Sequence, residues 1–117
     1  MSKIYGYAWE IEEETSCKKG GNVYFIRDGM GNIKIGIAKD VLRRKKELQT
    51  SNPNELEIFY VMHVPKMWDA QEIERELHES FSEYRKKGEW FIENTIIDWL
   101  RNGEIVAGGF RFQNADW

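Results

Sequence analysis

A short apolar run followed by closely spaced glycines constrains the fold of this chain more than any other sequence feature. Residues 23–26 read Val-Tyr-Phe-Ile, which is a β-rich run, and Asp-Gly-Met-Gly-Asn at 28–32 supplies strong turn chemistry. Residues 33–37 then alternate apolar side chains with lysine and glycine, as a returning strand does. We therefore predict a β-hairpin over residues 22–38, with a loop rather than a minimal turn.

A helix and a third strand are predicted after this hairpin. Asp40 is a good N-cap, and the residues through Gln49 favour a helix. Ser-Asn-Pro-Asn at 51–54 stops that helix. Apolar residues alternate over 56–62, which predicts a third and largely buried strand.

The clearest helix of the sequence begins near Trp68 or Asp69. Four residues spaced three and four apart mark its core face: Ile73, Leu77, Phe81 and Tyr84. We expect the helix to end at Gly88. An apolar cluster follows at 90–92, of which Trp90 and Phe91 are assigned to the core, and a short last helix is predicted over 95–100.

The two ends of the chain are predicted to be extensions of one small domain. Alternating aromatic residues near the N-terminus suit a short edge strand or an aromatic flap: Tyr5, Tyr7 and Trp9. We divide the chain into an N-terminal extension (1–21), a central domain (22–100), and a C-terminal tail or hairpin (101–117). The predicted fold is α/β in the α+β sense, with a three-stranded, mostly antiparallel sheet flanked by helices.

Composition limits the environment of the protein. The 117 residues are 41% hydrophobic and 14% aromatic, which is enough apolar material for one compact core. Cys17 is the single cysteine, so an intrachain disulfide and a cysteine-based zinc cluster are excluded. The sequence has no apolar run near twenty residues, and no signal-peptide core follows Met1. We expect a cytoplasmic protein without a membrane partner.

Charge is polarised along the chain although the net charge is only −3. Basic residues crowd one short stretch, where Asp40 is the one intervening acid: Lys39, Arg43, Arg44, Lys45 and Lys46. This stretch is either a solvated helix face or a track for a phosphate backbone, so an anion site is expected near 39–46. The acidic residues within 10–14 suggest a weaker hypothesis, in which the N-terminal segment folds over the basic stretch.

Five short motifs follow one another between residues 22 and 92. In chain order they are Asn22-Val23-Tyr24, then Lys34-Ile35-Gly36, then Lys39-Asp40 through Arg43-Arg44 with Glu47-Leu48-Gln49-Thr50, then Glu74 with Leu77-His78, and finally Gly88-Glu89-Trp90-Phe91. The ordered set is far more specific than any one piece. It resembles the GIY-YIG endonucleases, most closely the branch typified by a small open reading frame of a T5-like phage.

This resemblance implies three functional residues. Tyr24 matches the tyrosine of the first motif, Arg44 matches the catalytic arginine, and Glu74 matches the glutamate that holds a divalent metal, Mg²⁺ or Mn²⁺. Their chemistry suits phosphodiester hydrolysis, because a hard cation accepts a carboxylate and an arginine stabilises charge on phosphate oxygens. Tyr24 would position or deprotonate a water, the latter only if nearby positive charge lowers its pKa from about 10.

Two further residues are candidates for the same site. Lys34 stands where the tyrosine of the second motif is usual, so a mechanism that requires two tyrosines is in doubt. Lysine there would stabilise a phosphate oxygen, or act as a base if its pKa were depressed. His78 lies one helical turn after Glu74 and is a candidate for proton transfer or for orienting a water. The base remains open among Tyr24, Lys34 and His78.

Each of these residues also has an ordinary structural interpretation. Tyr24 would be a strand aromatic, Arg44 a solvated charge, Glu74 one surface glutamate among several, and His78 a hydrogen-bonded structural histidine. The joint order of the motifs favours the functional interpretation. We therefore predict a metal-dependent nuclease, a hydrolase that cuts nucleic acid, with DNA more expected than RNA. The predicted nucleic-acid contacts are Lys39, Arg43, Lys45 and Lys46.

One alternative keeps the fold without the chemistry. A catalytically inactive module of the same scaffold would bind nucleic acid or a host protein, and Lys34 in place of tyrosine keeps this alternative open. The terminal aromatic segments would serve either base stacking or formation of a homodimer. The chain has no room for a separate DNA-reading domain, so substrate recognition would rest on nucleic acid structure or on an accessory protein.

Overall fold

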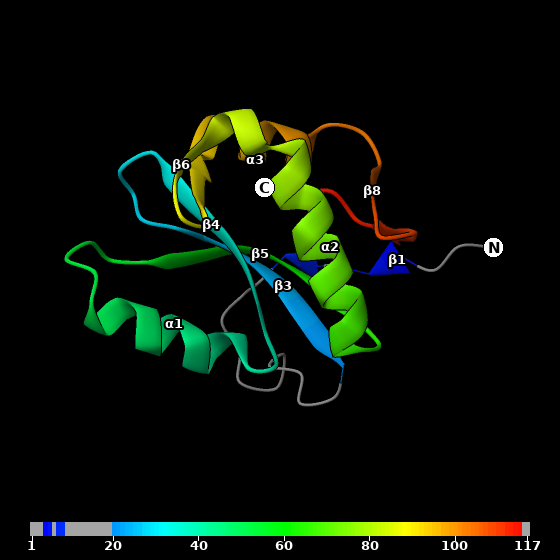
Figure 1. The fold of residues 1–117 in the computed structure, drawn as a ribbon, viewed down its shortest axis with the longest axis horizontal. Coiled ribbons are helices and arrows are strands. Elements are labelled where there is room, and N and C mark those ends of the chain that lie inside the picture. Colours follow the sequence, from blue (N-terminus) through cyan, green and yellow to red (C-terminus); the bar gives the residue numbers. More distant parts are fainter. Residues whose placement is uncertain (1–3, 6, 9–19, 116–117) are drawn as a thin grey trace.

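The structure, a computed structural model, describes residues 4–5, 7–8 and 20–115 (Figure 1). Trp9, Cys17 and the acidic residues of 10–14 lie outside the described residues, as does the hypothesis that this segment covers the basic stretch. A six-stranded antiparallel sheet forms the centre of the fold, in the spatial order β2-β5-β3-β4-β7-β6. Three helices flank it, and the predicted α+β class is confirmed.

The three predicted strands are the middle of this sheet. The hairpin consists of β3 (Gly21–Arg27) and β4 (Asn32–Ala38), and β5 (Glu57–Val64) pairs with the other edge of β3. The hairpin loop is closed by hydrogen bonds between the backbone and a side chain: Asp28 Oδ1 accepts from the Met30 and Asn32 amides. The sheet is wider than predicted because short strands extend it on both sides.

The added strands are too short to carry a periodic sequence signal. On the β4 side lie β7 (Trp90–Ile92) and β6 (Arg85–Lys87), and on the β5 side lies β2 (Tyr7–Ala8). The partners of β7 on β4 end at Lys34. The next residue of β4, Ile35, is bonded instead by the turn before β7 and by His78: its amide donates to the Glu89 carbonyl at 3.2 Å, and its carbonyl lies 2.9 Å from the His78 ring.

The alternation of side chains along β3 divides the core into two layers. Val23 and Phe25 belong to a large apolar cluster that includes α2 (Met67–Ser80) and α3 (Glu93–Arg101). Tyr24 and Ile26 belong to a smaller cluster with α1 (Val41–Thr50). Because successive strand residues point to opposite faces, the helices cover both faces of the sheet (Figure 1). A strand buried on both faces explains the continuous apolar run at 23–26.

The first helix begins and ends as its sequence predicts. Asp40 is the N-cap of α1, and its carboxylate accepts a hydrogen bond of 3.0 Å from the Arg43 amide. The helix ends at Thr50, and the following loop is held by Gln49. The amide nitrogen of that side chain donates to the Asn54 carbonyl at 2.7 Å, and its oxygen accepts from the Leu56 amide.

The long helix is shorter than its apolar spacing indicated. Ile73, Leu77 and Phe81 are buried as predicted, but α2 ends at Ser80 and not at Gly88. A 3-10 turn, η2 (Ser82–Tyr84), continues the three-residue spacing, so periodicity alone could not locate the end. Gly88, with φ of +57°, lies in the turn between β6 and β7.

The predicted C-terminal hairpin is present and belongs to the large core. It consists of β8 (Ile105–Ala107) and β9 (Phe110–Phe112), and β1 (Ile4–Tyr5) adds a parallel strand to β9. Ile105 and Phe112 are buried in the same cluster as α2. Among the described residues, no helix is long and apolar enough to cross a membrane.

Candidate active site

Tyr24 and Arg44 meet between the central strand and the first helix. Tyr24 is buried on β3, and the Arg44 guanidinium, from α1, donates a hydrogen bond to its phenol oxygen. Helical spacing explains the approach, since Arg44 is three residues after the buried Val41 and so lies beside the face that packs on the sheet. The two residues that the resemblance paired in one site are thus in direct contact.

Burial decides the protonation of Tyr24. Loss of solvent raises the pKa of the Tyr24 phenol, and the carboxylates of Glu89 and Glu74 raise it further. The Arg44 hydrogen bond and charge lower the pKa, but the net shift is upward from 10. Tyr24 is therefore a neutral phenol at physiological pH, and the condition for its use as a phenolate base is not met.

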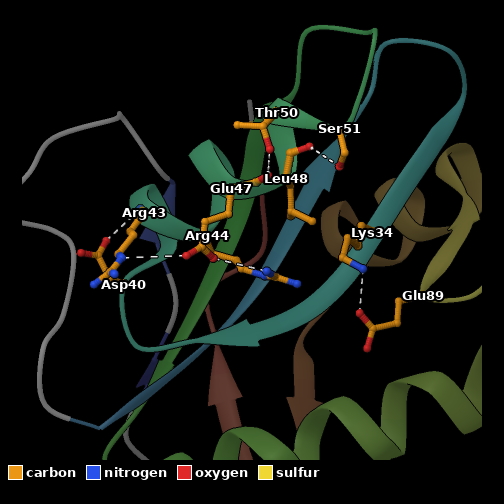
Figure 2. A network of polar contacts seen from close by, with 9 residues as sticks. All are labelled: Lys34, Asp40, Arg43, Arg44, Glu47, Leu48, Thr50, Ser51 and Glu89. Carbon is orange, nitrogen blue, oxygen red and sulfur yellow. Dashed lines mark hydrogen bonds and ion pairs between the residues drawn. The ribbon is translucent and has the colours of Figure 1, made fainter.

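Lys34 forms an ion pair with a residue that the sequence analysis did not assign to the site. Its Nζ lies 2.7 Å from Oε1 of Glu89, which occupies the turn between β6 and β7 (Figure 2). The Lys34 side chain is only 9% exposed, and its ammonium lies 5.9 Å from the centre of the Trp90 ring. In Figure 2 the Arg44 side chain reaches from α1 toward the side of β4 where this pair lies.

Glu74 and His78 of α2 complete the cluster. The ligand atoms of Glu74, His78 and Glu89 all lie within 4.8 Å of one another. Desolvation raises the pKa of the Glu74 carboxyl, and repulsion from Glu89 adds to it, whereas His78 and Lys34 lower it. The predicted proximity of Glu74 and His78 is confirmed, and Glu89 joins them from a distant part of the sequence.

His78 is held by hydrogen bonds at both ring nitrogens. Its Nε2 lies 2.9 Å from the carbonyl oxygen of Ile35 on β4, and its Nδ1 lies 3.2 Å from Nη2 of Arg85. A carbonyl oxygen only accepts and a guanidinium only donates, so the proton of the neutral ring belongs on Nε2. The ring also packs edge-on against Phe91 at 5.1 Å. Nδ1 is thus the ring nitrogen that carries the lone pair.

The chemistry of this cluster fits a divalent cation. Two carboxylates and an imidazole, each partly buried, converge within the space that one ion spans. Carboxylate oxygens suit Mg²⁺, and an additional imidazole is also compatible with Mn²⁺. Glu74, expected to be the metal residue, is a member of the set.

The basic stretch does not form a single face. Because successive helical residues are rotated by about 100°, residues 43–46 are spread around α1. Arg44 turns to Tyr24, whereas Arg43 is 80% exposed. Lys45 lines a cleft on another side of α1 together with Glu55, Glu57 and Glu93. Lys39 and Lys46 are exposed.

Two residues of the site were missed by the sequence analysis: Glu89 and Arg85. Glu89 lies inside the recognised motif at 88–91, which was the signal that could have identified it. Arg85 lies on β6 and reaches both His78 and the Phe91 ring, 5.5 Å from the ring centre. It lies in a segment predicted to be helical, so its contacts could not be inferred.

The sequence as a whole matches a known family. Residues 21–104 match the T5orf172 domain, and the chain therefore belongs to the T5orf172 domain family, a family of phage open-reading-frame domains. The match covers the three helices, every residue of the cluster and all strands of the central sheet except β2. No curated protein and no solved structure matches the chain significantly. The family is compatible with a nuclease-like or DNA-binding function.

Proposed function

We propose that this protein is a metal-dependent endonuclease of the GIY-YIG type that hydrolyses phosphodiester bonds of nucleic acid, with DNA as the favoured substrate. The observation that carries this proposal is the convergence of two sets of groups. The Tyr24–Arg44 pair supplies a fixed guanidinium, and the carboxylates of Glu74 and Glu89 supply a cation site next to it. We assign the activity to the domain at residues 22–100.

Arg44 is the group that would bind the scissile phosphate. The Arg44 side chain is 42% exposed, and its guanidinium is oriented by the buried Tyr24 phenol and by the Glu47 carboxylate at 3.3 Å. It can therefore donate to non-bridging phosphate oxygens that displace Glu47. Tyr24 acts as a neutral group that positions Arg44 and a water. The upward shift of its pKa argues against a phenolate base.

His78 is the best proton acceptor of the three candidates. Its Nε2 donates to the Ile35 carbonyl, which leaves the lone pair of Nδ1 for a proton. Arg85 now donates to that nitrogen at 3.2 Å, and a phosphate oxygen would attract the Arg85 guanidinium away from it. Lys34 is paired with Glu89 and is assigned to charge stabilisation rather than to proton transfer.

Glu74 and Glu89 would hold the metal ion, with His78 within reach of it. When bound, a divalent cation supplies Lewis acidity toward a phosphate oxygen and favours formation of a hydroxide nucleophile. Two carboxylates that repel each other in a partly buried place gain most from such a cation, which is consistent with the upward shift of the Glu74 pKa.

Cleavage of a labelled panel tests this proposal. The panel contains single strands, duplexes, nicked and branched DNA, and RNA, each with Mg²⁺, Mn²⁺ or EDTA. We expect cutting that requires the metal and is lost in Glu74→Gln and Arg44→Gln. Glu72→Gln and Arg75→Gln are matched controls, because these two residues pair with each other on the exposed side of α2 and should retain activity.

A binding module is the second candidate. The Lys34–Glu89 ion pair favours it, since the pair neutralises part of the cluster without any metal. A wild-type protein that binds nucleic acid with strong salt dependence but cuts no substrate of the panel would favour this candidate. Binding that survives Glu74→Gln would support the same conclusion.

A further inference from the structure

We infer that Lys34 is a built-in counter-ion of the metal site, which a divalent cation must displace from Glu89. This inference rests on the proposed function, because it concerns the same cluster. It assigns to Lys34 a regulatory role: the ammonium blocks one metal ligand in the metal-free protein and becomes available for a phosphate oxygen once the ion is bound.

The first observation is that the lysine and the ion would share a ligand. Lys34 Nζ lies 2.7 Å from Glu89 Oε1, and Glu89 is one of the three residues whose ligand atoms converge within 4.8 Å. A carboxylate oxygen that accepts a charged hydrogen bond from an ammonium is a weaker ligand for a cation. Binding of the ion to Glu89 therefore competes with the ion pair.

The second observation is that burial keeps the Lys34 ammonium beside the cluster, so it does not simply move into solvent when an ion binds. Its side chain is 9% exposed, on a central strand of the sheet, and packs beside the Trp90 ring. A divalent ion at Glu74 and Glu89 would lie close to this ammonium, and two positive charges in a partly buried place repel each other. The repulsion is relieved when Lys34 meets an anion, and the substrate supplies one.

The competition makes metal binding and phosphate binding cooperative. Without substrate, Lys34 opposes the ion. With a phosphate present, Lys34 has an alternative partner, so the ion binds Glu89 with less opposition. By linkage, the ion also increases the affinity for the phosphate. A tyrosine at position 34 would carry no charge and would give no such coupling.

Titration calorimetry with Mn²⁺ alone tests the competition in the folded, full-length protein. We expect Lys34→Met to bind Mn²⁺ more tightly than wild type, by about fivefold, which is the scale of one partly exposed ion pair. Glu89→Gln should bind more weakly than wild type. The double variant should gain much less over Glu89→Gln than Lys34→Met gains over wild type, because without the carboxylate only the charge repulsion from Lys34 is left to relieve. Lys87→Met, an exposed lysine two residues before Glu89, is the matched control and should leave the affinity unchanged.

Several results would overturn the inference. If Lys34→Met binds Mn²⁺ no more tightly than wild type while melting at a similar temperature, Lys34 does not compete for Glu89. If the gain persists at full size in the Glu89→Gln background, the effect does not act through that carboxylate. Either result leaves the proposed nuclease function intact, because cleavage by wild type is measured separately. If wild type and Lys34→Met both fail to bind Mn²⁺, the metal site itself is wrong.

Binding of a DNA duplex tests whether Lys34 contacts a phosphate once a metal ion is bound. With Ca²⁺ present, the slope of log affinity against log salt should be smaller for Lys34→Met than for wild type by about 0.9, the contribution of one phosphate contact. In EDTA the two slopes should agree, since Lys34 then remains with Glu89. Equal slopes in Ca²⁺ as well would refute the transfer of Lys34 to phosphate.

Discussion

The phenol ring of Tyr24 lies directly over Gly36, its partner across strands β3 and β4. A methyl group at Gly36 would come within 2.3 Å of the Tyr24 hydroxyl oxygen and 2.5 Å of the adjacent ring carbon. Glycine at this position of the second motif therefore leaves free the space that the tyrosine of the first motif occupies. This relationship joins the two motifs physically and fixes the phenol that orients Arg44.

The first prediction follows from that contact. Gly36→Ala should lower the free energy of unfolding by about 1–3 kcal/mol, because a buried ring on a central strand has little space to move. In a Tyr24→Leu background the same substitution should cost much less, since the atoms that clash are absent. Chemical denaturation of the four proteins in this cycle measures the coupling. An equal cost of Gly36→Ala in both backgrounds would show that the ring does not determine the glycine.

Local signals explain how much of the fold could be predicted from the sequence. The turn residues at 28–32, the N-cap Asp40 and the alternation over 56–62 each act within a few residues, and the structure contains the corresponding elements. The β6 and β7 strands could not be predicted, because three residues carry no periodicity, and β7, on which β6 pairs, is placed by β4 more than fifty residues away. The predicted helix end at Gly88 was wrong because the 3-10 turn at Ser82–Tyr84 continues the apolar spacing past the true end of α2.

Within the candidate site, the sequence predicted only the residues to which its motifs assign a role. Tyr24 with Arg44 and Glu74 with His78 were proposed together and do lie together. Glu89 could not be given a role, because its ion pair with Lys34 joins residues 55 positions apart. The basic stretch was interpreted as either a solvated helix face or a track for a phosphate backbone, and helical rotation sends Arg44 and Lys45 to different surroundings.

The second prediction concerns the shape of the guanidinium. Arg44→Lys keeps the charge but loses the planar fork that can bond the Tyr24 oxygen and a phosphate oxygen together. The cleavage rate should fall by about 100-fold, the usual effect of removing one donor from a preorganised site. Arg43→Lys is the control, because the Arg43 side chain is largely exposed, and its rate should remain close to wild type. If Arg44→Lys cleaved at the wild-type rate, the reaction would require the positive charge of Arg44 and not its planar shape.

The third prediction separates two neighbours on α1. Arg43 faces solvent, whereas Lys45 lines the cleft that contains Glu55 and Glu57. In EDTA, Arg43→Gln should lower the affinity for a DNA duplex and reduce the salt slope by about 0.9. Lys45→Gln should change neither value. The opposite order would place the nucleic acid along the other side of the helix.

The fourth prediction is a dependence of stability on pH through His63. This residue lies on β5, and its Nδ1 is 3.1 Å from Oδ1 of Asn22 on the neighbouring strand. Burial lowers the pKa of the His63 ring below its usual 6.5, and a hydrogen bond with the Gly21 backbone only partly offsets this. The unfolded chain therefore binds the proton more readily than the folded protein does.

The sign of the effect follows from this difference. Between the folded pKa and about 6.5, the unfolded state holds more protons, so the free energy of unfolding falls as the pH falls through that window. Urea unfolding of wild type at pH 7.5 and pH 5.5 should show the loss. His63→Gln cannot take up a proton, so the loss between the two pH values should be smaller in that variant. If wild type and His63→Gln lose the same stability on acidification, the ring is not desolvated enough to matter. Glu74 could not supply such a loss, because its raised pKa makes the folded protein the tighter proton binder and acidification through that carboxyl stabilises the fold.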